Sequence, residues 1–137
     1  MASILINQNC ILEINDYSTL GDNVEIICNN KISIGKHVDI TWDCRITDFG
    51  SHPVMDVSTG KFSKLYSFVE IGDYCWLGNR STVMPGTKLP NRTIVASNSL
   101  LNKNYIELGI KKYFLLGGIP AKLIKEDFKR TDYESDK

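Results

Sequence analysis

The chain has 137 residues, of which 42% are hydrophobic and 23% are charged, a composition typical of one globular domain. Sixteen basic residues balance sixteen acidic ones, so no global charge favours binding to nucleic acid or to an anionic membrane. The start of the chain lacks the basic leader and apolar core of a signal peptide, and no run approaches the roughly 20 apolar residues of a membrane span. We therefore expect a single cytoplasmic domain, residues 1–137.

The N-terminal third shows strands without a strict repeat. Residues 1–10 are expected to form an imperfect cap, because stacked architectures must cover their exposed end strands. Alternating pairs such as Leu12 and Ile14 predict short strands, and residues 11–47 should supply about two irregular turns of a coil.

Residues 47–68 interrupt this pattern with the segment TDFGSHPVMDVSTGKFSKLYSF. A structureless excursion of this length is uncommon in a compact domain. A rigid scaffold that bears one long loop usually presents its chemistry there, so we predict an active-site loop.

From Ile71 the chain follows a six-residue register, in the units IGDYCW, LGNRST, VMPGTK, LPNRTI, VASNSL and LNKNYI. Every unit opens with an aliphatic residue. The fifth place of the first five units is small or β-branched: Cys75, Ser81, Thr87, Thr93 and Ser99. A period of six fits neither a helix nor a meander, and it predicts a parallel β-helix with one inward aliphatic residue per short strand and a small residue at each corner. Six residues at about 3.3 Å give a face of roughly 20 Å, and three faces close one rung.

The register extends backwards through three isoleucines, Ile34, Ile40 and Ile46. Leu20 and Ile26 keep the six-residue spacing, but their positions are shifted by two residues relative to this register. We therefore predict a slip near residues 29–31.

After Leu101 the aliphatic spacing loosens. The run Gly-Gly-Ile-Pro at 117–120 predicts a turn, and AKLIKEDFKR at 121–130 has the pattern of a short amphipathic helix. Residues 119–130 are thus expected to be a C-terminal turn and helix, followed by a frayed end at 131–137.

The four cysteines show no CxxC pair and no spacing typical of a zinc site. Cys44 and Cys75 each occupy the fifth place of a unit, where the repeat requires a small residue. Packing therefore explains them without a redox or metal role.

Two histidines are present. His37 lies at an outward polar place of the unit IGKHVD and is expected to be a surface residue. His52 lies in the excursion, and Asp48 and Asp56, four residues to either side, could each fix the tautomer of its ring. A neutral imidazole with a pKa near 6.5 is the usual group for taking a proton from a hydroxyl at neutral pH, so His52 is a candidate general base.

Four segments are similar to the hexapeptide-repeat acyltransferases: SHPV (51–54), YSF (66–68), IGDYCWLGN (71–79) and GGIPAKLIK (117–125). The resemblance is to the galactoside and maltose O-acetyltransferases in particular, and to the polysaccharide O-acetyltransferases of lipopolysaccharide and capsule pathways. It covers most of residues 30–125.

This resemblance implies an all-β, left-handed parallel β-helix, an exception to the usual right-handed crossover, assembled as a homotrimer with active sites between subunits. It implies acetyl-CoA as acyl donor and His52 as the general base for direct attack of an acceptor hydroxyl on the thioester. The backbone N–H of Asn79 falls where the family stabilises the oxyanion. Asp48 falls where it could orient His52 or contact the acceptor.

The resemblance also implies a cofactor site. Trp76 falls beside the pantetheine arm, although a corner-packing aromatic would look the same. The other positions that fall on cofactor contacts are Ser97, Lys103, Gly118, Ile119, Pro120, Ala121, Lys122 and Lys125, the last two near phosphate.

Two departures from the family limit what carries over. LNKNY replaces the commoner sequence of the last rung, which should therefore be built differently. The longer N-terminal region of the galactoside and maltose enzymes, which contributes to sugar binding, has no counterpart here. Asn29 and Asn30, near the place of a family acceptor-binding asparagine, are the candidate acceptor contacts.

Other functions of this coil fit less well. γ-Class carbonic anhydrases need three histidine ligands per zinc, which two separated histidines cannot supply, so no metal is expected. An ice-binding coil would present rows of threonine, whereas the outward positions here carry charges such as Arg80, Lys88 and Arg92. The sequence thus favours O-acetylation of a sugar hydroxyl in cell-surface polysaccharide synthesis. The alternatives are N-acetylation of a nucleotide-linked amino sugar, which needs a base less, and a catalytically silent homologue.

Overall fold

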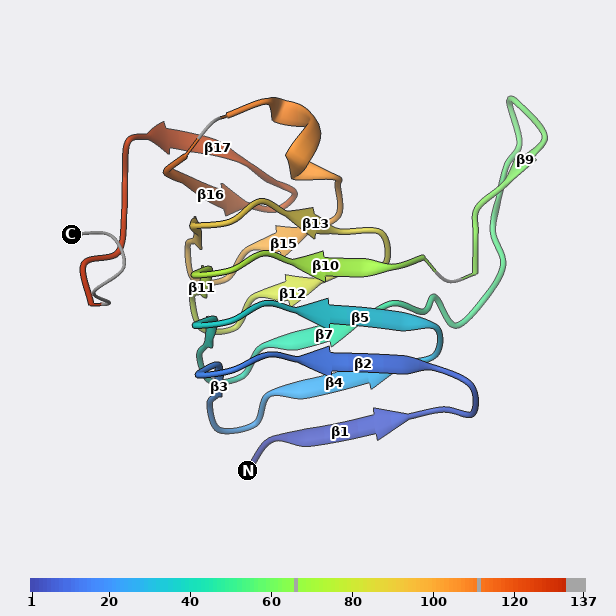
Figure 1. Cartoon of the computed structure of the whole chain (residues 1–137). Coiled ribbons are helices and arrows are strands. Elements are labelled where there is room, and N and C mark those ends of the chain that lie inside the picture. The colour runs from blue at the N-terminus through green and yellow to red at the C-terminus, as the bar shows by residue number, and fades with distance from the viewer. Residues whose placement is uncertain (66, 111, 133–137) are drawn as a thin grey trace.

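The computed structural model describes residues 1–65, 67–110 and 112–132, and it shows stacked strands that form a three-sided prism (Figure 1). Face A contains β1 (Ser3–Ile6), β4 (Glu25–Cys28), β7 (Arg45–Thr47), β12 (Thr82–Val83) and β15 (Leu100–Leu101). Face B contains β2 (Ile11–Ile14), β5 (Lys31–Ile34), β10 (Val69–Ile71) and β13 (Lys88–Leu89). Face C contains β3 (Thr19–Leu20), β6 (Asp39–Ile40), β11 (Trp76–Leu77), β14 (Thr93–Val95), β16 (Phe114–Gly118) and β17 (Ala121–Glu126).

The chain runs through faces A, B and C in turn, and one full turn of the coil is one rung. Neighbouring rungs pair in parallel on every face, so the predicted parallel β-helix is confirmed. The left-handed sense of the coil stays a prediction.

Successive rungs keep equivalent residues in register. On face A, Val83 pairs with Leu101, which follows the repeat. Ile26 pairs with Ile46, so the earlier rung is two residues longer. The additional residues lie in the bend at 29–30 between β4 and β5, where the sequence predicts the slip.

The aliphatic residues that open the regular units form the core of the prism. All of them are buried: Ile71, Leu77, Val83, Leu89, Val95 and Leu101. Burying each such side chain stabilises the fold by about 1.5–3 kcal/mol, so the column is the main source of stability.

The small residues of the fifth place are buried at the corners: Cys75, Ser81, Thr87, Thr93 and Ser99. Corner carbonyls leave the ladder between rungs and need other donors. The Thr93 hydroxyl donates to the Pro90 carbonyl at 2.8 Å, and the Ser99 hydroxyl donates to the Ala96 carbonyl at 2.6 Å. Cys75 donates to the Pro90 carbonyl at 3.2 Å, and burial raises the pKa of its thiol to about 12, in keeping with a packing role.

The described residues of the predicted active-site loop form a hairpin that projects from the prism between β7 and β10 (Figure 1). Its strands β8 (Met55–Asp56) and β9 (Lys61–Phe62) pair antiparallel. At the base of the hairpin, the Ser67 N–H donates to the Asp48 carbonyl at 2.9 Å. This hydrogen bond joins the outgoing chain to the returning chain.

The prediction of a C-terminal helix is wrong, because residues from Ala121 onward form β17, which pairs antiparallel with β16. A two-residue turn at Ile119 and Pro120 reverses the chain so that Gly118 pairs with Ala121. Gly118 has φ +106°, a conformation that favours glycine. The turn places the following residues beside the otherwise unpaired edge of β16. The hydrogen bonds that they form with β16 outweigh the helical pattern of their side chains.

The last rung is built differently, as its sequence predicts. The 3₁₀ turn η1 (Tyr105–Leu108) replaces a strand of face B, and the buried Tyr105 hydroxyl donates to the Ala121 carbonyl at 2.9 Å. In the described part of the chain, no helix has the length and apolarity needed to cross a membrane.

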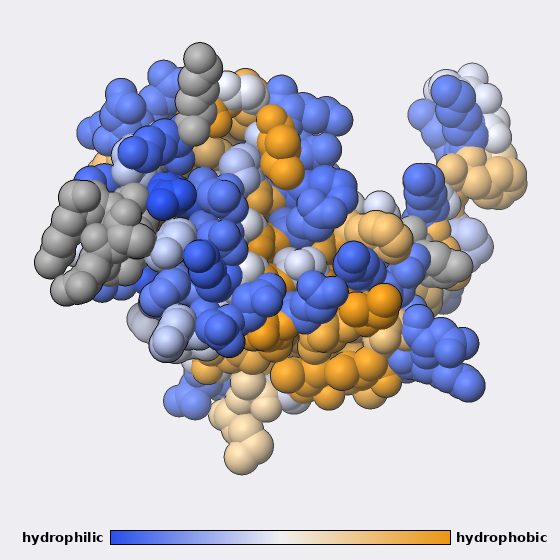
Figure 2. Space-filling model, in the orientation of Figure 1, coloured by the Kyte–Doolittle hydropathy of each residue, from blue (hydrophilic) through white to orange (hydrophobic). Residues whose placement is uncertain are grey.

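The N-terminal end of the prism is apolar. Residues 1–10, predicted as a cap, contain β1, which pairs with β4 and so begins the first rung. Figure 2 shows hydrophobic residues gathered over the lower end, where β1 and β2 lie; the exposed side chains are Ile4, Leu5, Ile6, Ile11 and Ile14.

Replacing Val83 by Asp should lower the free energy of unfolding by at least about 3 kcal/mol, because it places an unpaired charge in the aliphatic column. Chemical denaturation measures this loss. Thr82→Asp is the matched control, since Thr82 precedes Val83 in β12 and is only partly buried. Equal stability of the two variants would contradict the assigned register.

Candidate active site

The sequence-predicted site residues separate into two groups in the structure. One group lies at the corner between faces A and B: Asn29, Asn30, Asp48, His52 and Lys103. The other lies on face C or beyond it, at the corner between faces C and A: Trp76, Asn79, Ser97, Gly118, Ile119, Pro120, Ala121, Lys122 and Lys125. We call these two edges the A–B corner and the C–A corner.

His52 lies in a bend before β8 and is exposed. Within the described residues, the structure gives its ring no hydrogen bond. Asp56, one candidate orienting group, accepts hydrogen bonds from the Ser58 hydroxyl at 2.6 Å and the Ser58 N–H at 2.9 Å. These bonds lower the pKa of Asp56 and hold the tip of the hairpin.

Asp48, the other candidate orienting group, is fully buried. Its carboxylate accepts backbone N–H bonds from Asn29, Asn30 and Lys31 at 2.8, 2.8 and 2.7 Å. Three convergent N–H groups form a favourable site for a negative charge. Asp48 therefore fixes the bend between β4 and β5, where the longer rung leaves these donors without a ladder partner.

Asn79 and Ser97 lie one above the other at the C–A corner. The Ser97 hydroxyl donates to the Asn79 side-chain oxygen at 2.6 Å. The rungs approach so closely here that a Cβ on Gly78 would meet the Ser97 nitrogen at 2.6 Å. Across the described residues, the structure gives the Asn79 backbone N–H no acceptor.

Trp76 lies on face C beside a groove of ≈ 410 Å³, within the usual size of ligand pockets. The side chain is 40% exposed. Asp39 and Thr41 line the same side of the groove, and the C-terminal segment 129–132 forms the opposite side. The groove thus combines an aromatic wall with hydrogen-bonding groups.

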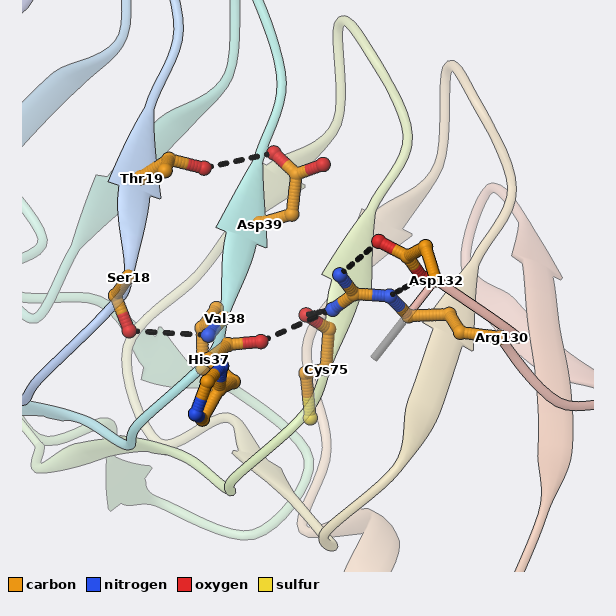
Figure 3. Close-up of polar contacts among 8 residues, drawn as sticks. All are labelled: Ser18, Thr19, His37, Val38, Asp39, Cys75, Arg130 and Asp132. Atoms are coloured by element: carbon orange, nitrogen blue, oxygen red, sulfur yellow. Dashed lines mark hydrogen bonds and ion pairs between the residues drawn. The ribbon is translucent and has the colours of Figure 1, made fainter. Parts of the chain in front are cut away.

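Arg130 holds this C-terminal segment against the prism (Figure 3). Its guanidinium donates to the carbonyls of His37 at 3.0 Å and Cys75 at 3.1 Å, on two successive rungs. It also pairs with Asp132 at 2.7 Å, and the hydrogen bonds from Arg130 lower the pKa of that carboxyl. Asp132 is therefore held in place, while residues 133–137 of the predicted frayed end lie outside the described residues.

His37 belongs to a column of stacked rings at the corner between faces B and C. Its ring lies between Tyr17 and Tyr74, at centroid distances of 4.9 and 5.0 Å. The Arg92 guanidinium lies 4.9 Å from the Tyr74 ring. The expected surface position is thus partly covered by neighbours on adjacent rungs.

A basic pocket at the base of the hairpin was not evident from the sequence. It has a volume of ≈ 450 Å³ and is lined by Asn30, Lys64, Ser67, Phe68 and Lys88. Its residues come from three rungs, and only the stacking brings them together.

The two groups of site residues lie at different edges of the prism in one chain, and Trp76 of the second group lies on the face opposite the first group. In a three-sided prism, face C is opposite the corner at which faces A and B meet. Figure 1 shows this arrangement, with the hairpin at one side and β11 at the other. In one chain, His52 and the Trp76 groove therefore lie on different sides of the prism.

Comparison with known proteins identifies acetyltransferases. The chain is 35% identical over 82 residues to a chloramphenicol acetyltransferase of Klebsiella aerogenes, covering 60% of this chain and 35% of the relative. It is 29% identical over 123 residues to a protein of Escherichia coli (strain K12) named as a lipopolysaccharide biosynthesis O-acetyl transferase, covering 84% and 57%. No family model matches the chain.

Among solved structures, a polysialic acid O-acetyltransferase superposes with a TM-score of 0.81 at 30% identity, covering 98% of this chain and 63% of that one. The resemblance found in the sequence is therefore confirmed: this chain is a homologue of O-acetyltransferases and shares their β-helix fold. The chain spans less than two thirds of the length of these relatives, so its own activity, acceptor and partners are proposals.

Replacing Asp48 by Asn should destabilise the fold by about 2–4 kcal/mol, because the new amide NH₂ would face backbone donors that now bind a carboxylate. Urea denaturation measures the loss. Asp56→Asn, at the exposed hairpin, serves as the matched control with a small effect. An Asp48→Asn protein of unchanged stability but reduced turnover would instead assign Asp48 to catalysis.

Proposed function

We propose that this chain is an acetyl-CoA-dependent O-acetyltransferase that acts on a sugar hydroxyl in cell-surface polysaccharide synthesis. The names of the relatives support acetyl transfer to glycans. Acetyl-CoA is a cytoplasmic metabolite, which is consistent with the expected location.

The separation of the site into two groups is the observation that carries this proposal. The hairpin extends away from its own prism, and His52 lies in it between β7 and β8, so in this proposal His52 meets the C–A corner of a second copy. A cyclic homotrimer satisfies this requirement for every subunit, because each copy donates its hairpin to the next. Each active site then combines His52 of one subunit with Trp76 and Asn79 of its neighbour.

The C–A side has groups suited to the acyl donor, which supplies the acetyl group as a thioester. The groove beside Trp76 can take a narrow chain with amide groups, since Asp39 and Thr41 line it along with the indole. The turn at Ile119 and Pro120 lies two rungs further along the same corner and would hold the adenine end.

His52 has the chemistry of a general base in this site. Its ring takes the proton from the acceptor hydroxyl as that oxygen forms a bond to the acetyl carbonyl carbon. The Asn79 N–H donates to the carbonyl oxygen as it gains negative charge. The carbon–sulfur bond then breaks, and the proton on His52 passes to the departing thiolate.

An alcohol acceptor fits His52 better than an amine acceptor does. An alcohol must lose its proton to become a good nucleophile, whereas a free amine can attack once it is neutral. The N-acetylation of an amino sugar therefore stands second.

Replacing His52 by Ala should lower the acetyl-transfer rate at least about a hundredfold, since the hydroxyl loses its proton acceptor. Thiol release with acetyl-CoA and a panel of sugars measures the rate, and binding of coenzyme A should persist. His37→Ala, which changes the other histidine, is the control. Undiminished turnover in His52→Ala would exclude this residue as the base.

Subunit mixing tests the shared site directly. His52→Ala and Trp76→Ala should each be weakly active alone, while random mixed trimers should regain about a quarter of the wild-type activity, because each restored site needs one intact residue from each neighbour. The measurement is turnover after co-refolding tagged subunits. Activity that stays at the average of the two parents would place the whole site within one chain.

A further inference from the structure

Trp42 is a large aromatic residue at the C–A corner, between β6 and β7, and its side chain is 51% exposed. Cys44, two residues further along, is buried, so the corner itself is closed by a small residue and does not need the indole for packing. The Trp42 carbonyl accepts the Arg80 N–H at 3.1 Å, which places Trp42 one rung before the Asn79–Arg80 corner.

Charged residues occupy positions next to Trp42. Asp43 follows it in the chain and forms an ion pair of 3.9 Å with Arg80, whose backbone N–H donates to the Trp42 carbonyl. Asp22 occupies the equivalent corner position one rung earlier, where its side chain is highly exposed. An exposed apolar ring with carboxylates and a guanidinium at neighbouring positions suits a sugar, which has an apolar C–H face and hydroxyls on its rim.

The height of Trp42 along the prism matches the acceptor side of the proposed reaction. At the C–A corner itself, the proposed donor contacts run from Asn79 through Ser97 to the turn at Ile119 and Pro120, while Asp39 and Thr41 line the Trp76 groove on face C. In this arrangement the acetyl end of the donor lies at Asn79. The acceptor must then approach from the opposite direction, where Trp42 is the next outward side chain. Neighbouring rungs are about 4.8 Å apart, so Trp42 and the Asn79 N–H are separated by about the width of one sugar ring.

We propose that Trp42 is an acceptor-binding residue, whose indole stacks against a pyranose ring of the glycan and presents its hydroxyl to the acetyl group. This rests on the proposed function for the position of the acetyl group. Asp43 and Arg80 bind the hydroxyls at the rim of the same ring. In a parallel trimer, Asn29 and Asn30 of the neighbouring subunit belong to the same rung as Trp42 and so lie at the same height.

The chain contains two tryptophans, which allows each half of the site to be observed separately. Trp76→Phe leaves Trp42 as the sole tryptophan, and Trp42→Phe leaves Trp76, so excitation near the red edge of the indole band, which the tyrosines hardly absorb, reports on one residue at a time. Each protein is titrated with coenzyme A, with an oligosialic acid and with a maltooligosaccharide; the two saccharides probe acidic and neutral pyranose chains. We expect at least one saccharide to change the emission of the Trp42 protein, while coenzyme A changes that of the Trp76 protein.

Kinetics supply a second measurement. Trp42→Ala should raise the KM for the acceptor about three- to tenfold and leave the KM for acetyl-CoA unchanged, with partial rescue in Trp42→Phe. If the emission of Trp42 responds to neither saccharide, the inference is overturned. It is also overturned if Trp42→Ala changes the oligomeric state in light scattering, because Trp42 would then be an interface residue.

The two proposals fail in different ways. Absence of thiol release from wild-type protein with every sugar would count against the proposed acetyl transfer, while the emission of Trp42 still reports saccharide binding. Active wild-type enzyme with an unchanged acceptor KM in Trp42→Ala would reject the Trp42 subsite alone.

Discussion

Parallel pairing between successive rungs is the constraint on which the rest of the structure depends. Because each strand pairs in register with its equivalent one rung away, residues at equivalent places of the repeat form columns along the prism. An inward column must be aliphatic throughout, and a corner column must be small and able to satisfy carbonyls, as Thr93 and Ser99 do. The same stacking places outward residues such as Asn79 and Ser97 in contact, so a binding surface is built one rung at a time.

The two hollows that contain candidate site residues lie where segments outside the repeat are added, namely the hairpin at the A–B corner and the C-terminal segment over face C. The hairpin carries the candidate base, and the C-terminal segment closes one side of the Trp76 groove. Since the two lie on opposite sides of the prism, the geometry favours a site shared between copies.

Much of the fold could be predicted from the sequence because a period of six constrains every unit at once. The inward column follows that period. The slip at 29–30, the excursion and the altered last rung are departures from it. The C-terminal helix was predicted wrongly because the pattern of 121–130 is ambiguous by itself. Only the unpaired edge of β16, formed by residues earlier in the chain, decides that this segment is a strand.

The candidate site was predictable only in part, for a related reason. His52 and Trp76 could be located by motif, whereas the contacts of Asp48 and Arg130 depend on distant rungs. These two side chains bind opposite kinds of backbone group. The Asp48 carboxylate binds three N–H groups at the base of the hairpin, and the Arg130 guanidinium binds two carbonyls beneath the C-terminal segment. At residues 29–31 the longer rung leaves backbone N–H groups without ladder partners, and the buried carboxylate of Asp48 binds them. Arg130 instead adds to the ladder, because the Cys75 carbonyl that it binds also accepts the Asp39 N–H at 2.9 Å. The two added segments that shape the site are therefore each fixed to the prism by a charged side chain that binds backbone groups.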